Sequence, residues 1–137
     1  MNTQVIFNVR KTDGNTDFTG YITFNELDIN IGNGHNGATF VAPFSGLYKF
    51  SFFGTTGYGY PGLEPNYTMI NVEKNYVLSF TIYDEKPDVY HVGNNMAATW
   101  MWNLDKDDKV GFSITSRTMN ASKASPIFLN GELIHKN

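Results

Sequence analysis

The histidines are the side chains in this sequence whose chemistry would most readily suggest a catalytic or metal site. His35, His91 and His135 are far apart in the chain. None of them belongs to the His-x-His or His-x3-His spacing that a cupin or a zinc hydrolase uses to place two imidazoles on one ion. We therefore interpret the histidines as surface residues.

A cluster of carboxylates follows position 104 and consists of Asp105, Asp107 and Asp108. The tip of a β-hairpin needs residues that accept a tight turn and contact with solvent, and aspartate does both. We interpret this cluster as turn chemistry and not as a cation site.

No pattern in the sequence is typical of a catalytic centre. The chain has no cysteine, which excludes a thiol nucleophile and a thiolate metal site. It has no Ser-His-Asp arrangement, paired-carboxylate motif or metal-ligand box. The glycine-rich segments 32–37 and 54–62 neither end in Gly-Lys-Ser/Thr nor open a helix, so they are not phosphate loops. We expect a protein that is not an enzyme and requires no cofactor.

The second glycine-rich segment has the composition of a recognition loop. Tyr58, Tyr60 and Tyr67 lie in it or just after it, among glycine and proline. Tyrosine on an adaptable loop offers a large amphipathic contact area with few rotatable bonds. These tyrosines are candidate ligand-binding residues, and local packing of their rings is an equally supported alternative.

The segments that position these residues alternate between apolar and polar residues, with a period of two. Clusters of Gly, Asn, Asp and Pro separate these short segments. The pattern predicts ten strands, and it leaves residues 27–31 uncertain. The predicted strands cover residues 5–10, a strand that begins at 22–24, then 39–42, 46–56, 67–74, 77–83, 89–92, 97–104, 109–115 and 126–134. No apolar stripe of helical period extends over a usable window. The fold class is therefore all-β, a sandwich or barrel.

Two predicted strands are apolar on both faces. Tyr48, Phe50 and Phe52 share one face of a strand whose other face carries Leu47 and Phe53. Residues 100–102, Trp-Met-Trp, repeat this pattern. A sandwich strand needs only one apolar face, so the second face either packs against a neighbouring subunit or belongs to a wide monomer core.

The chain length and the net charge limit the number of domains and the kinds of partner that we expect. The 137 residues fit a single domain, 1–137. The net charge of −3 gives no footprint for a phosphate backbone, so nucleic acid is not an expected partner. No apolar run approaches 18 residues, and we expect no membrane insertion. The first 20 residues lack a signal-peptide pattern, so a secreted protein would have lost its leader.

Three segments, in order, resemble the complement C1q-type globular head. Residues 39–52 read Thr-Phe-Val-Ala-Pro-Phe-Ser-Gly-Leu-Tyr-Lys-Phe-Ser-Phe, similar to that family's Phe-x-x-Pro-x-x-Gly-x-Tyr-x-Phe-x-Phe signature. Residues 104–110 resemble its Leu-x-x-Gly-Asp-x-Val hairpin, with Asp107 in place of glycine, and residues 127–134 resemble its closing strand. Residues 5–12 and 22–25 look like its opening strands. The resemblance implies a ten-stranded jelly-roll sandwich, shared with the tumour necrosis factor ligands, that assembles as a homotrimer.

The same resemblance suggests two sites. Some family members hold calcium in a loop that follows a Tyr-Asp pair, and Tyr83-Asp84 matches that pair. Asp84, Glu85 and Asp88 would then be the metal ligands, although calcium needs six to eight oxygens and a second acidic position of the family is missing here. A tyrosine commonly occupies the position of His35 in the family, which leaves a ligand-binding or packing role open for His35.

The resemblance favours a secreted, extracellular recognition protein of innate immunity. Such a lectin-like module would bind glycans, microbial surface molecules or a protein receptor through exposed loops. The sequons at Asn66 and Asn120 are consistent with secretion. Two alternatives stay open: a signalling ligand for a cell-surface receptor, and a structural head that trimerises a collagen-like or filamentous protein.

Overall fold

The structure is a computed structural model that describes residues 3–16, 20–56, 67–85, 95–115 and 119–137. Eleven strands and no helix run through these residues. In chain order the strands are β1 (Ile6–Lys11), β2 (Gly20–Tyr21), β3 (Glu26–Ile31), β4 (Phe40–Val41), β5 (Gly46–Thr56), β6 (Tyr67–Lys74), β7 (Val77–Glu85), β8 (Asn95–Leu104), β9 (Lys109–Thr115), β10 (Met119–Asn120) and β11 (Ile127–Lys136).

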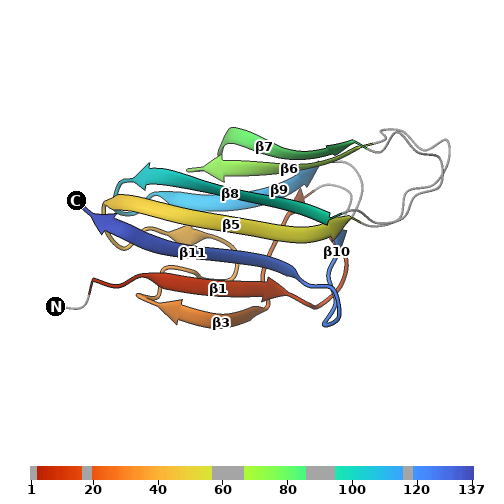
Figure 1. Cartoon of the computed structure of the whole chain (residues 1–137), viewed down its shortest axis with the longest axis horizontal. Helices are drawn as coiled ribbons and strands as arrows, with labels where there is room; N and C mark the ends of the chain where they lie inside the picture. Colours follow the sequence, from red (N-terminus) through yellow and green to blue (C-terminus); the bar gives the residue numbers. More distant parts are fainter. Residues whose placement is uncertain (1–2, 17–19, 57–66, 86–94, 116–118) are drawn as a thin grey trace.

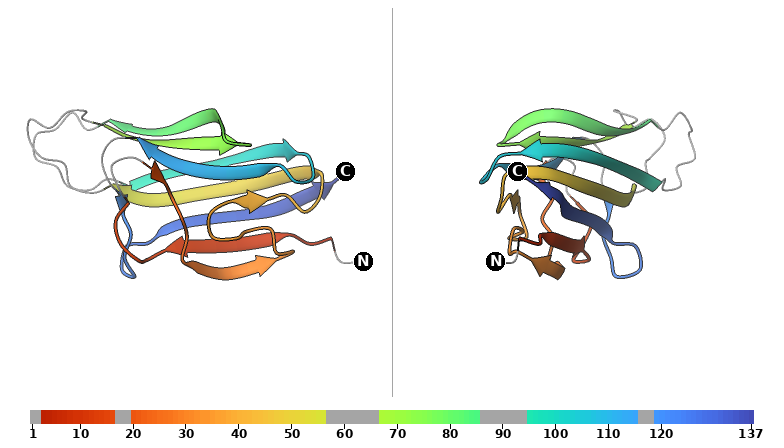
Figure 2. Two further views of the ribbon diagram at one scale, coloured as in Figure 1. Left: turned by 180° about the vertical axis from the view of Figure 1, so that it is seen from behind. Right: turned by 60° about the vertical axis from the view of Figure 1, so that its left-hand side comes forward.

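The strands form two antiparallel sheets that pack face to face (Figure 1). Sheet A has six strands: β8, β5, β11, β1 and β3 lie side by side, and β10 pairs with the last residues of β5. Sheet B has five: β2, β9, β6 and β7 lie side by side, and β4 also pairs with β9. The two sheets come together along one edge, where β7 contacts β8. Figure 2 shows the layers from behind and in an oblique view with the left-hand side of Figure 1 brought forward.

The prediction of an all-β sandwich is confirmed, and most of the predicted strands match the observed ones. The uncertain residues 27–31 belong to β3, and the two-residue strands β2 and β10 were not predicted. The predicted strand at 22–24 is wrong. Ile22 and Phe24 are buried but lie between strands, where their backbone amides donate to the carbonyls of Phe112 and Gly37. The predicted strand at 89–92 lies outside the described residues.

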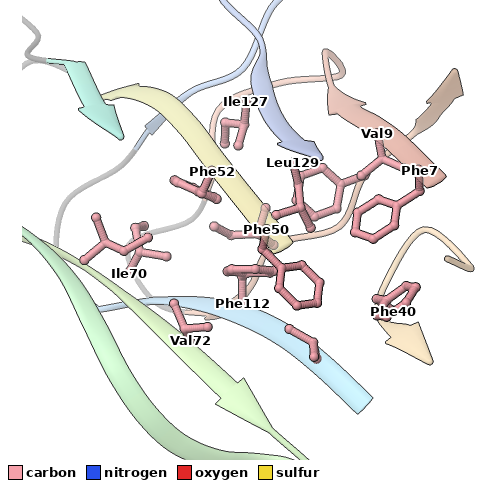
Figure 3. Packing of buried hydrophobic residues seen from close by; sticks show 14 of the residues in the cluster. Phe7, Val9, Phe40, Phe50, Phe52, Ile70, Val72, Phe112, Ile127 and Leu129 are labelled. Carbon is pink, nitrogen blue, oxygen red and sulfur yellow. The ribbon is translucent and has the colours of Figure 1, made fainter. Parts of the chain in front are cut away.

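The core lies between the sheets and is built from the inward residues of the period-two pattern (Figure 3). Tyr48, Phe50 and Phe52 of β5 are at most 1% exposed, as the alternation predicts. The Phe40 ring lies edge-on to Tyr48 at 5.5 Å between centroids, and Phe52 stacks on Phe112 from sheet B at 5.6 Å. The Tyr48 hydroxyl, the one polar group of this stack, donates to the carbonyl of Phe44 at 2.7 Å. Aromatic burial of this kind supplies most of the stabilisation of a sandwich.

Two hairpins contain non-glycine residues in the left-handed region. Asn75 and Tyr76 join β6 to β7 with φ of 53° and 65°, which is the pattern of a type I′ turn. Asp107, in the turn between β8 and β9, has a φ of 73°. Aspartate tolerates this conformation better than most residues, which explains how it replaces the glycine expected at this position.

Candidate functional site

Half of the tyrosines and carboxylates predicted as site residues fall outside the described part of the chain. Tyr58, Tyr60 and Asp88 lie there entirely. The backbones of Tyr67 and Glu85 pair with each other at the end of the β6–β7 ladder, which places the predicted tyrosine and one predicted calcium ligand at the same end of sheet B. Asp84 is next to Glu85 in β7. Within the described ranges, no group of three or more His, Asp or Glu side chains could hold a metal ion.

His35 is a core residue, so its interpretation as a surface residue is wrong. The side chain is 3% exposed, and its ring packs against Phe7 at 5.2 Å and Phe24 at 5.6 Å between centroids. The backbone amide of Gly37 donates to its Nδ1 at 2.9 Å. Burial lowers the pKa of His35 to about 4, because the apolar surroundings disfavour the charged ring. Of the two roles left open, the described contacts fit packing, and ligand binding by His35 stays a prediction.

The acidic residues 105–108 are turn residues, as predicted. The Asp108 carboxylate accepts hydrogen bonds from the Asp105 amide at 2.8 Å and from Asn75 Nδ2 at 3.0 Å. Lys74 lies 3.5 Å from the same carboxylate. Partial burial raises the pKa of Asp108, but the hydrogen bonds from Asn75 and Asp105 together with the Lys74 charge outweigh it, and the pKa lies below its usual value. The carboxylate therefore ties the two hairpins together.

The outer face of sheet A, which points away from the core, carries exposed apolar side chains among polar ones. It carries the outward members of β5, β8, β11, β1 and β3. Its large or apolar side chains are Ile6, Ile29, Ile31, Leu47, Phe53, Ala97, Met101 and Phe128. Met101 is 61% exposed and Phe53 is 40% exposed, and the Phe53 ring meets Phe128 on the neighbouring strand at 6.3 Å. Exposed apolar side chains gathered on one face are typical of a contact surface for another molecule.

A groove of about 330 Å³ runs across this face. One cross-strand row at its floor consists of Ser51, Asn130, Asn8 and Ile29, and the next row consists of Lys49, Glu132, Ile6 and Ile31. All of these except Ile31 line the groove. Asn8 Oδ1 is buried there without a hydrogen-bond partner. An unpaired buried acceptor costs free energy, so a donor from a molecule seated in the groove would stabilise the complex.

The outer face of sheet B, on the opposite side of the molecule, carries an ordered row of polar side chains and the exposed Tyr83. Tyr21, Ser113, Asn71 and Thr81 form one cross-strand row on it. Asn71 Nδ2 donates to Ser113 Oγ at 3.1 Å and to Thr115 Oγ1 at 2.8 Å, and Ser113 Oγ donates to Glu73 at 2.8 Å. These contacts hold the polar side chains in fixed positions beside the Tyr21 ring, which is 64% exposed.

Sequence reasoning did not find either outer face in full. The two-sided apolar pattern located Leu47, Phe53 and Met101, because they alternate with core residues. Ile29 and Phe128 were missed, since nothing in the sequence says which strands lie beside β5. The polar row on sheet B was missed for the same reason: its members come from four separate strands.

The chain matches no family model and no curated protein sequence. Its fold is similar to several solved structures. The globular domain of zebrafish complement 1qA protein matches at 17% identity and a TM-score of 0.74, over 97% of this chain and 99% of that one. Murine APRIL matches at 10% identity and a TM-score of 0.71, over 96% of this chain and 100% of that one. Eiger TNF from S. frugiperda matches at 7% identity and a TM-score of 0.71, over 99% of this chain and 96% of that one.

Proposed function

Because the chain folds as a C1q/TNF-like jelly roll, we propose that it is a non-catalytic recognition module that works as a homotrimer. It binds glycans, microbial surface molecules or a protein receptor. The single observation that carries this proposal is the apolar outer face of sheet A. In a fold that implies trimers, this face is the surface that a neighbouring copy would cover.

The chemistry of the outer face of sheet A supports self-association. Met101 on β8, the edge strand of sheet A, and Phe53 on the neighbouring strand β5 expose apolar area. Burying such area is the main driving force of association. Lys49 and Glu132 lie directly opposite each other on β5 and β11, so the face also carries both charges. A neighbouring copy could meet each charge with its opposite, which would fix the register of the subunits.

Ligand binding is assigned to the surfaces that a trimer leaves free. The outer face of sheet B points away from sheet A, so it stays accessible when the outer face of sheet A is covered. Tyr58 and Tyr60, between β5 and β6 in the sequence, and Tyr67, the first residue of β6, are proposed as further contacts. A fixed array of amide, hydroxyl and carboxylate groups beside an exposed tyrosine ring suits a polar, hydroxyl-rich ligand such as a glycan. An extracellular location follows from this role and is part of the proposal.

Calcium is a further element of the proposal, with Asp84, Glu85 and Asp88 as the ligands. Calcium that binds the folded protein raises its melting temperature by mass action. A calorimetric titration with calcium that shows no heat, together with an unchanged melting temperature, would remove the metal from the proposal.

The recognition role is tested with the trimer itself. The assembled protein, verified by light scattering, is applied to a glycan array and to whole bacteria. Selective binding that is weakened by Tyr21→Ala or Asn71→Ala, with the trimer intact, supports the assignment. A verified trimer that binds no glycan and no bacterium would contradict the preferred ligand class.

A signalling ligand is the second candidate, favoured by the structural similarity to Eiger TNF. This candidate differs from the first in its ligand: it requires one protein partner on a cell surface, bound tightly and without glycan. Cell binding that survives enzymatic removal of surface glycans but not removal of surface protein would select it.

A further inference from the structure

The loop between β3 and β4 contains an Asn-Gly pair surrounded by groups that fit a reaction of the loop with itself. The backbone amide of Gly37 donates to His35 Nδ1 at 2.9 Å. Asn36 Oδ1 accepts from the amides of Ala38 and Thr39, each at 2.8 Å. Asn36 Nδ2 lies 3.4 Å from the Thr39 hydroxyl. Every polar atom of the Asn36 carboxamide thus has a defined partner.

These contacts match the requirements for attack of a backbone nitrogen on a side-chain amide. The nitrogen of Gly37 is the atom that would close a five-membered ring on Asn36 Cγ, and His35 Nδ1 is placed to take its proton. The amides of Ala38 and Thr39 point at the oxygen that would become negative, which is the arrangement of an oxyanion hole. The Thr39 hydroxyl lies beside the leaving nitrogen.

We propose that Asn36 is a self-modification site, at which this loop catalyses the conversion of its own asparagine to aspartate or isoaspartate. A bond forms between Gly37 N and Asn36 Cγ while His35 Nδ1 accepts the proton of the amide. The bond from Cγ to Nδ2 then breaks, and Nδ2 leaves as ammonia with a proton returned through the Thr39 hydroxyl or from His35. Water opens the resulting succinimide at either carbonyl, and the net reaction consumes one water and releases one ammonia.

The surroundings of the loop keep these groups in place. His35 is buried between Phe7 and Phe24, which fixes its ring. Its pKa of about 4 keeps the ring neutral at neutral pH, and the hydrogen bond from Gly37 identifies Nδ1 as the nitrogen without a proton. Gly37 has a φ of 95°, and an added Cβ would lie 3.1 Å from the carbonyl oxygen of Phe24, so only glycine fits there. Asn36 is exposed, which gives water access to the succinimide.

Two further Asn-Gly pairs in the chain serve as internal controls. Asn33-Gly34 lies in the turn just after β3, and among the described residues no hydrogen bond reaches the Asn33 side chain. Asn130-Gly131 lies within β11, where the backbone is paired with β1 and β5. All three pairs share the same dipeptide, so differences in their rates report the local structure.

The experiment follows deamidation at the three sites by peptide mapping and mass spectrometry, in the native chain and in the same chain unfolded in denaturant. We expect the deamidation rate at Asn36 in the native chain to exceed its rate in the unfolded chain by roughly tenfold. This increase is smaller than general-base catalysis usually gives, because the His35 imidazole is a weak base. The native rates at Asn33 and Asn130 should be no higher than their unfolded rates. A native rate at Asn36 at or below the unfolded rate would overturn the proposal.

Two substitutions separate catalysis from loop stability. His35→Asn keeps a hydrogen-bond acceptor for the Gly37 amide but removes the base, and it should reduce the Asn36 rate to the unfolded value while Asn33 is unchanged. Thr39→Val removes the hydroxyl beside the leaving nitrogen and should slow the reaction, whereas Thr39→Ser should restore it. The Thr39 pair keeps the test independent of whether His35→Asn folds. Unchanged rates in folded variants would contradict the assigned roles.

Discussion

His35 is a residue whose burial has a consequence for stability as a function of pH. Its pKa is about 4 in the folded protein, and an unfolded histidine has a pKa of about 6.5. Between these values the unfolded chain binds a proton that the folded chain does not. The contribution of His35 is therefore fully present above about pH 6.5 and is lost as the pH falls towards 4.

We predict that this loss amounts to roughly 3 kcal/mol in the free energy of unfolding, from the difference of about 2.5 pKa units. Urea unfolding measured from pH 7 to pH 4 checks it. His35→Phe should flatten the dependence in this window, while substitution of the exposed His135 by glutamine should leave it as in the parent. Equal slopes for the parent and His35→Phe would show that His35 is not its source.

Gly131 is a second residue with a consequence for stability, because the packing around it leaves no space for a Cβ atom. The ring of Phe7 lies over it, and a Cβ added there would collide with that ring. Phe7 is 1% exposed and cannot move aside freely. We predict that Gly131→Ala lowers the free energy of unfolding by about 1–3 kcal/mol through overpacking.

The matched control for Gly131 is Gly111. It lies in a strand of the opposite sheet, and an added Cβ there would make only an ordinary contact with Thr39 Cγ2 at 3.5 Å. Gly111→Ala should change stability by less than about 0.5 kcal/mol. Chemical denaturation of the two variants side by side measures the difference, and equal losses would rule out the collision with Phe7 as the cause.

At the residue scale, the alternation of apolar and polar residues predicted which side chains are buried, whereas the spacing of the histidines did not. Tyr48, Phe50 and Phe52 were assigned to the core because a strand alternates its faces. His35 was assigned to the surface because it lacked metal-ligand spacing, but spacing carries no information on burial. Its environment is built by Phe7 and Phe24, which are distant in sequence.

The β6–β7 hairpin shows strain at the scale of an element. Tyr76 adopts a φ of 65°, a conformation that costs a residue with a Cβ about 1 kcal/mol or more. The type I′ turn prefers Asn-Gly at its two central positions, and the chain already supplies Asn75. The Tyr76 side chain is 64% exposed, so little packing depends on it.

We predict that Tyr76→Gly raises the free energy of unfolding by about 0.5–1 kcal/mol, since relief of strain outweighs the added entropy of the unfolded chain. Tyr76→Ala keeps the Cβ and should bring no gain. Thermal unfolding of the two variants measures this difference. A gain from alanine as large as that from glycine would point to the tyrosine ring, and not to the backbone, as the source of the cost.

Strand positions could be predicted more readily than strand partners. The ranges of β5, β6 and β9 were predicted to the residue, because each alternates cleanly and ends at turn residues. Ile22 and Phe24 also alternate, but they lie in a connection whose amides bond to Phe112 and Gly37. The bond to Phe112 of β9 does not extend into a ladder, so burial can impose a strand-like pattern on a segment that lies outside the strands.

At the scale of the whole molecule, the outer face of sheet A is the surface that the proposed trimer would bury. We predict that Met101→Glu, which places a charge on β8 at the most exposed apolar position of this face, converts the proposed trimer to monomer. Light scattering should then fall from about 46 kDa, three times the chain mass, to 15.4 kDa. A buried unpaired carboxylate is costly enough to prevent association.

Val77→Glu is the control for this prediction. Val77 is 67% exposed, close to the 61% of Met101, but it lies at the start of β7 in sheet B. This variant should remain a trimer. If both variants are monomers, or if the parent protein is a monomer at micromolar concentration, the outer face of sheet A is not the contact surface.

The groove on this face could not have been predicted from the sequence. Its floor joins Ser51, Asn130 and Asn8 from three strands, and the register that aligns them is set by the pairing of β11 with both β1 and β5. Residue patterns along one strand do not specify such long-range pairing. The sequence resemblance predicted the fold class but not the shape of this surface.

The pairing of β1 with β11 also constrains when the protein can form during synthesis. Residues 6–11 leave the ribosome long before their partners at 127–132, because the other strands are synthesised between them. Until β11 emerges, β1 and β5 lack the neighbour that lies between them in sheet A. The nascent chain therefore exposes unpaired strand edges until β11 is synthesised, and sheet A cannot be completed before then.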